Sequence, residues 1–438
     1  MPYKYIFKLL MITLKVPYVR KIAMLSYVKV SSGFSKVNAT GNTIVFMYEP
    51  RFRKLAQELE NKGFNIIFLG RGIFDYIFRI YLNEYIKNNK RTFSEYALDV
   101  YEKYKRERKL YLEESTYIAK LLKEYLSSST IILPKYNDDY TLELVQSFHD
   151  SGWVTIVYDR EGTVTKRRLD HIPQIISRQA STCDYILTYN ETHKNFFEKV
   201  FSLSSINSPE IIVMGNPASD EWFHDTGFDI SNTKKQKSGE KKILFFAFGE
   251  FSYVYDTEYL RGKNEVWRSL LQDIHDVFTD YLTENPKHCL WYKRGPKGNR
   301  DYWPGSEKLL GIANACLIPS NANSNQLIKD CDVVVAFQTT ALIDAMHTDK
   351  VIIYCAWGDT YEELKNDLID FEAYAQAGAI LHARTPDEFK YLLSLDHSNY
   401  IVNYSARKQI RELFTTNPDG NVAKRFAEWI VDTFPSTN

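Results

Sequence analysis

The stretch from residue 331 to residue 354, CDVVVAFQTTALIDAMHTDKVIIY, contains two short apolar runs that flank a segment of helical length. The runs DVVVAF (332–337) and KVIIYC (350–355) are rich in β-branched residues, which is typical of buried strands. Strand, helix and strand in this order predict a βαβ crossover in a parallel sheet. Thr339 and Thr340 stand where the helix begins, so they either cap it or help its free N–H groups to bind an anion.

The same alternation of apolar runs and helix-length segments continues along most of the chain. We expect further strands at 43–48, 65–70, 130–134, 153–159, 183–190, 210–215, 242–249, 289–295 and 315–319. This pattern predicts an α/β protein with two doubly wound, Rossmann-like domains that face a cleft. Ligands of such sheets bind at the carboxyl ends of the strands.

The length of 438 residues is too great for one ordinary core, so two domains are expected. The polar run SNTKKQKSGEKK (231–242) is the best boundary between them. The predicted divisions are an N-terminal segment (1–40), a first domain (41–225), a linker (226–241), a second domain (242–400) and a C-terminal helical segment (401–438).

The composition excludes several classes of function. Lys+Arg and Asp+Glu balance at 55 each, so no overall positive charge favours nucleic acid. The sequence has no phosphate-binding P-loop, no G-x-G-x-x-G and no His or Cys spacing typical of metal sites, so we expect neither a bound metal nor a redox cofactor. No apolar run reaches the roughly 18–20 residues of a membrane span. Five scattered cysteines fit a cytoplasmic protein.

The N-terminal segment is basic and aromatic. Seven Lys or Arg residues precede the first acidic residue, Glu49, and large apolar residues are interleaved with them. One interpretation is peripheral binding to the anionic inner face of a membrane. The other is a helix that packs its apolar stripe on the protein itself, and the sequence does not separate the two.

Four polar loops follow expected strands. Each one alone is explained as a turn or a helix cap, but all four lie at the carboxyl edge of a predicted sheet, which favours a binding site. The loops are DREG (159–162), GNPASD (215–220), KRGPKG (293–298) and QTT (338–340).

These loops and their neighbours resemble the GT-B glycosyltransferases of bacterial capsule and lipopolysaccharide assembly, over residues 40–435. In that family a strand is followed by a Ser/Thr pair, a helix with Glu-Ala, and GKPVI. Here the corresponding residues are Thr339-Thr340, Asp344-Ala345 and DKVII (349–353). The Gly-Asn-Pro of 215–217 and the late Asp-Gly…Arg of 419–425 are also typical of the family.

The resemblance implies that the second domain binds a nucleotide-sugar donor and that the first binds the acceptor, a glycan or a lipid-linked glycan. Gln338, Thr339 and Thr340 would hold the donor phosphate, and Asp344 would contact the donor. Lys293 and Arg294 take the place of a Lys-x-His-Pro turn, without its histidine, and would neutralise the leaving phosphate without a metal.

Sugar transfer also needs a carboxylate near the anomeric carbon. The candidates are Asp159, Glu161 and Asp220. Transferases of the acidic sugar Kdo pair an acidic-Gly loop with a G-x-P-R-x-D loop, and GNPASD keeps its glycine, proline and Asp220 but lacks the arginine. Asp220 alternatively caps a helix that starts at Glu221. The basic residues at 166–168 (Lys166, Arg167 and Arg168) would bind a sugar carboxylate or an acceptor phosphate, or form a solvated charged turn.

Three other functions stay open. A polyol-phosphate transferase of the CDP-glycerol type shares this fold, but a histidine base would be expected and these loops lack one. A sugar-nucleotide 2-epimerase also shares the fold and needs no acceptor. A GT-B relic that serves as a scaffold would lack activity.

Overall fold

The computed structural model describes residues 42–47, 52–70, 72–82, 103–126, 128–136, 141–159, 165–224, 240–249, 266–294 and 306–434. Within these ranges the chain forms two parallel six-stranded sheets, which we call sheet A (order β2-β1-β3-β4-β5-β6) and sheet B (order β12-β11-β10-β7-β8-β9). It divides into two compact units, of which unit 1 is Met1–Gly162, His171–Asp220 and Asp419–Asn438 and unit 2 is Thr163–Asp170 and Glu221–Pro418.

Unit 1 is built on sheet A. Its strands are β1 (Thr43–Met47), β2 (Asn65–Leu69), β3 (Thr130–Leu133), β4 (Val154–Tyr158), β5 (Tyr185–Thr188) and β6 (Glu210–Val213). Its helices are α3 (Arg53–Asn61), α4 (Gly72–Tyr81), α7 (Lys105–Leu126), α8 (Thr141–Asp150), α10 (Glu191–Ser202), the 3-10 turn η2 (Pro217–Asp220) and α20 (Val422–Thr433), while α9 (Lys166–Ser177) has residues in both units.

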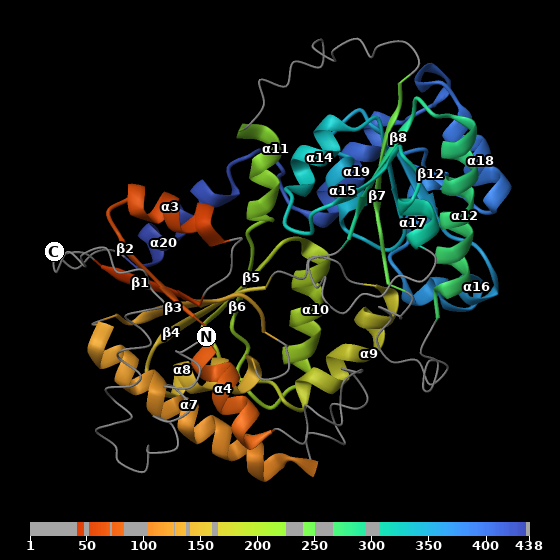
Figure 1. Ribbon diagram of the computed structural model, residues 1–438. Coiled ribbons are helices and arrows are strands. Elements are labelled where there is room, and N and C mark those ends of the chain that lie inside the picture. The colour runs from red at the N-terminus through yellow and green to blue at the C-terminus, as the bar shows by residue number, and fades with distance from the viewer. Residues whose placement is uncertain are drawn as a thin grey trace, which may run out of the picture. The chain divides into compact units, whose positions relative to one another are not determined.

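The two faces of sheet A are covered by different helices, with α3 and α20 on one side and α4, α7 and α8 on the other (Figure 1). Helix α20 therefore covers part of sheet A, although most of the strands of that sheet come from the first half of the sequence. Phe426 of α20 packs against Phe46 of β1 and Tyr158 of β4, at ring-centroid distances of 6.5 and 5.7 Å. Full burial of a large apolar side chain is worth about 1.5–3 kcal/mol, so this helix contributes strongly to the core.

Unit 2 is built on sheet B. Its strands are β7 (Lys242–Phe246), β8 (Cys289–Lys293), β9 (Ala315–Ile318), β10 (Val333–Ala336), β11 (Val351–Cys355) and β12 (Leu381–Ala383). Its helices are α11 (Glu221–His224), α12 (Arg268–Glu284), α13 (Ser306–Leu310), α14 (Ser324–Asp330), α15 (Ala341–Ala345), α16 (Asp359–Leu364), α17 (Phe371–Gln376), α18 (Pro386–Ser394) and α19 (Tyr404–Phe414), with 3-10 turns η5 (Lys365–Asp367) and η6 (His397–Asn399).

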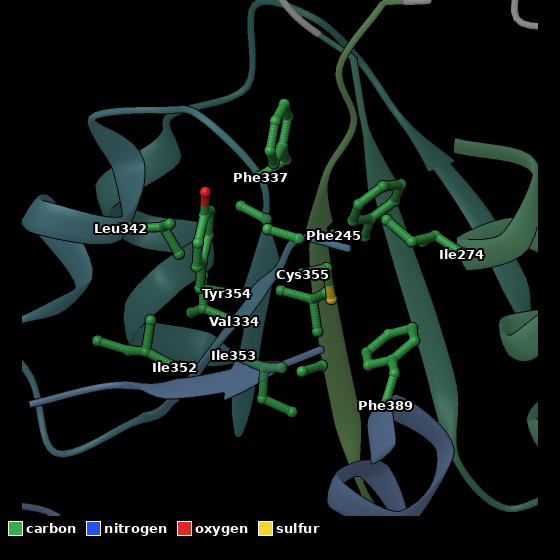
Figure 2. Packing of buried hydrophobic residues seen from close by; sticks show 14 of the residues in the cluster. Phe245, Ile274, Val334, Phe337, Leu342, Ile352, Ile353, Tyr354, Cys355 and Phe389 are labelled. Atoms are coloured by element: carbon green, nitrogen blue, oxygen red, sulfur yellow. The ribbon is translucent and has the colours of Figure 1, made fainter. Parts of the chain in front are cut away.

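The centre of sheet B is fully buried, which explains why its strands read as continuous apolar runs. Strand β10 has no exposed residue, and its neighbours β7 and β11 pair with it in parallel. Figure 2 shows Phe245 of β7 between Ile274 of α12 and the central strands, with Tyr354 of β11 lying near Phe337 on the other side. Phe337 and Tyr354 stack with a centroid distance of 6.0 Å.

The predicted fold class is confirmed, and eleven of the twelve strands in the described residues lie where the apolar runs predicted them. The missed strand is β12, which has only three residues, Leu381–Ala383, and too little pattern to detect. Of the expected segment 401–438, α19 belongs to unit 2 and α20 to unit 1. The basic segment 1–40 and most of the linker, 226–239, lie outside the described residues. The predicted domain boundaries stay predictions.

In the part of the chain that the structure describes, no helix combines the length and the apolar character needed to cross a membrane.

Candidate functional site

The loop after β10 contains Gln338, whose side-chain amide forms hydrogen bonds with other residues of the protein. Its Nε2 donates hydrogen bonds to the hydroxyl of Tyr354 (2.8 Å) and to the carbonyl of Ile369 (3.1 Å). Its Oε1 accepts from the backbone N–H of Ile369 (2.9 Å). Gln338 thereby ties β10 to β11 and to the segment before α17. Its predicted contact with a phosphate would require breaking these bonds, and stays a prediction.

Thr339 and Thr340 differ in their surroundings. The Thr339 hydroxyl accepts a hydrogen bond from the N–H of Ala341 (3.3 Å), so it supports the turn that opens α15. Thr340 stands at the N-cap of α15 with an exposed side chain, which makes no capping bond to the described residues. Asp344 is half-buried on the same helix, and its N–H donates to the carbonyl of Thr340 (3.0 Å). Thr340 is therefore the member of the pair whose hydroxyl is available to a ligand.

Lys293 is the last residue of β8 and Arg294 follows it, and the two have different surroundings. Lys293 is 5% exposed, and its Nζ donates to the carbonyl of Ser320 after β9 (3.0 Å). Burial lowers the pKa of Lys293. Arg294 is half-buried, and its Nε has no hydrogen-bond partner among the described residues. Since β7 alone separates β8 from β10, Arg294 and Thr340 both follow strands at the carboxyl edge of sheet B.

Trp267 is a further residue of this edge, and it was not among the predicted site residues. It stands at the N-cap of α12, is 1% exposed, and packs edge-on against Phe337, the first residue after β10, at 4.8 Å between ring centroids. Its indole Nε1 also has no hydrogen-bond partner in the described ranges. No local pattern marks it, because it depends on a contact between residues 70 positions apart.

The edge of sheet B thus carries buried N–H donors on Trp267 and Arg294 that have no acceptor among the described residues. A buried donor left unsatisfied costs about 1–3 kcal/mol. The oxygen atoms of a phosphate or a sugar are acceptors of the kind that such donors bind.

The edge of sheet A gathers three residues from neighbouring strands. Asp159 follows β4, Tyr136 follows β3, and His193 lies in the first turn of α10, after β5. The Asp159 carboxylate accepts from the N–H of Tyr136 (3.0 Å) through Oδ2, and its Oδ1 lies 3.8 Å from Nε2 of His193. All three side chains are inaccessible to solvent.

His193 and Tyr136 were not among the predicted site residues. His193 packs on Phe197 at 5.0 Å between ring centroids, and its N–H donates to the side chain of Asn190, the N-cap of α10. The Tyr136 hydroxyl donates to the carbonyl of Ser181 (2.6 Å) and accepts from its N–H (2.8 Å). The available signal was the N-cap asparagine directly after an apolar run, which places His193 at the carboxyl edge.

Asp220 is 1% exposed and caps a helix that is remote in sequence. Its carboxylate accepts from the N–H groups of Val422 (3.1 Å) and Ala423 (2.9 Å), the first residues of α20. A cap on the helix that starts at Glu221 was the alternative role for Asp220, and the bonds described here run to the start of α20. This contact gives Asp220 a structural role, and its catalytic role stays a prediction.

The remaining predicted residues lie partly outside the structure. Glu161 is not among the described residues. The backbone of Lys166, Arg167 and Arg168 forms the first turn of α9, so this stretch is helical. In the described portion of the chain, no cluster of three or more His, Cys, Asp or Glu residues is arranged to hold a metal ion.

No protein-family model matches the chain, and no curated protein matches its sequence. Solved structures do match. UDP-GlcNAc 2-epimerase from Neisseria meningitidis bound to UDP-GlcNAc has a TM-score of 0.51 at 11% identity, over 90% of this chain and 100% of that one. A putative UDP-N-acetylglucosamine 2-epimerase from Listeria monocytogenes has a TM-score of 0.50 at 12% identity, over 91% and 98%. An α,α-trehalose-6-phosphate synthase from Burkholderia multivorans scores 0.49 at 11% identity, over 90% and 96%. At these identities the likeness concerns the fold, which is of the GT-B type with two Rossmann-like units.

Proposed function

We propose that the chain is a glycosyltransferase that moves a sugar from a nucleotide-activated donor to a glycan or lipid-linked glycan of a surface polysaccharide. The observation that carries the proposal is the pair of buried donors at the carboxyl edge of sheet B, on Trp267 and Arg294, that have no acceptor among the described residues. This is the edge where sheets of this class bind ligands. The GT-B-type fold supports the proposal, and so do the sugar-nucleotide enzymes among the structures that share it.

In this proposal sheet B holds the donor. The guanidinium of Arg294 and the hydroxyl of Thr340 bind the phosphates, and the indole N–H of Trp267 donates to a further donor oxygen. Lys293 adds positive charge near the leaving phosphate while its Nζ stays on the Ser320 carbonyl. Fixed positive charge at this point stabilises the charge that develops as the bond to the sugar breaks. Asp344 contacts the donor.

The reacting carboxylate in this proposal is Glu161, in the loop after β4. Asp159 and Asp220 are the other two candidates, but both are buried and accept hydrogen bonds from backbone N–H groups. A carboxylate that is occupied in this way is poorly placed to meet a substrate. Lys166, Arg167 and Arg168 would bind an anionic group of the acceptor or of the donor sugar.

A second candidate function is a sugar-nucleotide 2-epimerase. It is favoured by the two structures with TM-scores of 0.50 and 0.51, both of which are described as UDP-N-acetylglucosamine 2-epimerases, one as a putative one. An epimerase would use the same donor subsite on sheet B and would need no acceptor. We also propose that the enzyme acts in the cytoplasm, with the basic segment 1–40 resting on the inner face of the membrane.

The first experiment is a thermal-shift panel of UDP, CDP, CMP, GDP and dTDP. A ligand that binds only the folded state at 100 times its Kd adds about 2.7 kcal/mol of stability, so the correct nucleotide raises Tm. Trp267→Phe keeps the ring contact with Phe337 and removes the N–H, and we expect it to reduce the shift. The matched control is Trp291→Phe on β8, where the ring is half-buried beside Lys242.

The second experiment distinguishes a glycosyltransferase from a 2-epimerase. Its substrate is a sugar nucleotide that contains the nucleotide found to bind in the first experiment. A transferase releases the nucleotide only when the acceptor is present or when water takes the place of the acceptor. It leaves the configuration of the sugar at C2 unchanged. An epimerase produces the 2-epimer without acceptor. If no nucleotide in the panel shifts Tm, the donor site is wrong.

A further inference from the structure

We propose that Gln338 is a positioning residue of the donor site, which anchors the loop after β10 and thereby holds the hydroxyl of Thr340 in place for a phosphate of the donor. The consequence for binding rests on the proposed function. The anchor itself can be tested without a ligand, because it consists of hydrogen bonds between described residues of unit 2.

The helix that follows the loop is too short to fix the loop by itself. Helix α15 has five residues, Ala341–Ala345, and an isolated helix of this length does not form in water. Burial of Leu342 holds α15 against the core, but Thr340 at the N-cap makes no capping bond to the described residues. The position of Thr340 therefore depends on the contacts of the residues that precede it.

Gln338 forms a two-point contact with the backbone before α17. Its Oε1 accepts from the N–H of Ile369 (2.9 Å), and its Nε2 donates to the carbonyl of the same residue (3.1 Å). This is the exchange of two bonds that a hydrogen-bonded pair makes between antiparallel strands. Two bonds to one residue fix the orientation of the side-chain amide as well as its distance.

Tyr354 takes the other N–H of the amide. Its hydroxyl accepts from Nε2 of Gln338 at 2.8 Å, and the side chain is 0% exposed. The register brings the two residues together, because Ala336 of β10 is paired with Tyr354 of β11 and Gln338 lies two residues further along the chain. An amide nitrogen has two N–H donors, and Ile369 and Tyr354 take both. The influence of Gln338 on a bound donor therefore passes through the loop.

The residues on either side of Gln338 are also held. Phe337 packs on Trp267 and Tyr354, at 4.8 and 6.0 Å between ring centroids, and the Thr339 hydroxyl accepts from the N–H of Ala341. The next residue, Thr340, has an exposed side chain.

The short distance along the chain couples Gln338 to Thr340. Two residues of chain span at most about 7 Å, so a displacement of Gln338 is passed on to Thr340. A shift of about 1 Å takes a donor out of the usual hydrogen-bond range of about 2.7–3.2 Å.

The first test measures the Kd of the nucleotide that raises Tm, by isothermal titration. Gln338→Met keeps the length of the side chain and removes the amide. Tyr354→Phe removes one of its partners at a position that is inaccessible to solvent, so it acts on a ligand only through Gln338. The control is Tyr281→Phe, which removes another buried hydroxyl of unit 2, one that donates to the carbonyl of Leu393 (2.7 Å).

We expect Gln338→Met to raise Kd about tenfold and Tyr354→Phe to raise it about threefold, because the Thr340 hydroxyl loses its position in both. Tyr281→Phe should lower Tm and keep Kd within about twofold. In the Thr340→Ala background, Gln338→Met should raise Kd by less than about twofold, since the group that it positions is gone.

Two results of the titration would overturn the proposal. A further rise of about tenfold in the Thr340→Ala background would make Gln338 a direct ligand of the nucleotide. An unchanged Kd in Gln338→Met alone would show that the site does not need the anchor.

A second measurement is independent of any ligand. Hydrogen exchange of the free protein, followed by mass spectrometry over residues 338–345, should be faster in Gln338→Met and in Tyr354→Phe than in the wild type, and unchanged in Tyr281→Phe. Equal exchange in all four proteins would disprove the anchor. If no nucleotide binds the wild type, the proposed donor site is wrong and the binding half of the inference falls with it, while the exchange still decides whether Gln338 anchors the loop.

Discussion

Asp220 and Val422 are joined by a hydrogen bond between the carboxylate of the one and the backbone N–H of the other (3.1 Å), although 202 positions separate them in the sequence. Ala423 donates to the second oxygen at 2.9 Å. The first N–H groups of a helix have no partner within the helix, and Asp220 accepts hydrogen bonds from two of them in α20. Its carboxylate also lies at the N-terminus of α20, where the positive end of the helix dipole attracts a negative charge. This contact fixes the start of α20, which lies on the same side of sheet A as α3 (Figure 1).

We predict that Asp220→Ala lowers the free energy of unfolding by about 1–3 kcal/mol, because two buried N–H groups lose their acceptor. Urea denaturation measures the change. Asp432→Ala, at an exposed position of the same helix, is the control and should stay within about 0.5 kcal/mol of the wild type. If Asp220→Asn abolished turnover and left stability unchanged, Asp220 would be a catalytic residue after all.

We predict that the folded protein loses stability as the pH falls from about 6.5 towards 3. Burial lowers the pKa of His275 to about 4, and burial together with the Arg411 guanidinium lowers that of His347 to about 3. In the unfolded chain both titrate near 6.5, so the unfolded state takes up protons first and is favoured as the pH falls.

The measurement is the unfolding free energy by urea at pH 7 and pH 4. The neutral ring of His347 accepts a hydrogen bond from Nη1 of Arg411 through Nδ1 (3.3 Å). His347→Gln keeps an acceptor and cannot titrate, so the difference between the two pH values should shrink. A difference as large as in the wild type would show that His347 does not contribute.

We predict that deletion of residues 1–35 weakens binding to vesicles that contain anionic lipid, with the larger loss at low salt, because ions screen the attraction of the basic residues. Vesicle co-sedimentation at two salt concentrations measures this, with neutral vesicles as the control. A truncated protein that aggregates or melts far earlier would instead indicate that the segment packs on the protein.

The fold was largely predictable from the sequence because buried parallel strands leave apolar runs that can be read locally. The carboxyl edges of the sheets, and with them the loops after β4, β8 and β10, were predictable for the same reason. The sequence did not predict which side chains at these edges are hydrogen-bonded within the protein. Gln338 is occupied by Ile369, 31 positions later, and Lys293 by Ser320, 27 positions later. Both contacts exist only after the strands have assembled.

The same limit explains the missed residues. Trp267, Tyr136 and His193 reach the edges through contacts across the sheet or between a helix and a loop, and no spacing rule encodes these. Polar residues at a strand end therefore indicate where a site lies. The tertiary contacts determine which of them remain available to a ligand.

Thr339 and Thr340 provide the clearest test of that distinction. We predict that Thr340→Ala weakens nucleotide binding by about 1.5–3 kcal/mol, the value of a hydrogen bond to a charged group, and leaves Tm of the free protein unchanged. Its hydroxyl makes no capping bond to the described residues, so the fold does not need it. Isothermal titration with the nucleotide that raises Tm measures the affinity.

Thr339→Ala is the matched comparison, because the hydroxyl of Thr339 accepts from the N–H of Ala341 and supports the start of α15. Losing a bond of this kind costs about 0.5–2 kcal/mol of stability, so this variant should lower Tm of the free protein. Its affinity should fall less than that of Thr340→Ala, since only the turn is loosened. If the two variants lose equal affinity, both hydroxyls bind the ligand and the turn rearranges on binding. If neither loses affinity, the phosphate does not bind at α15, and Arg294 and Trp267 must be satisfied by another part of the donor.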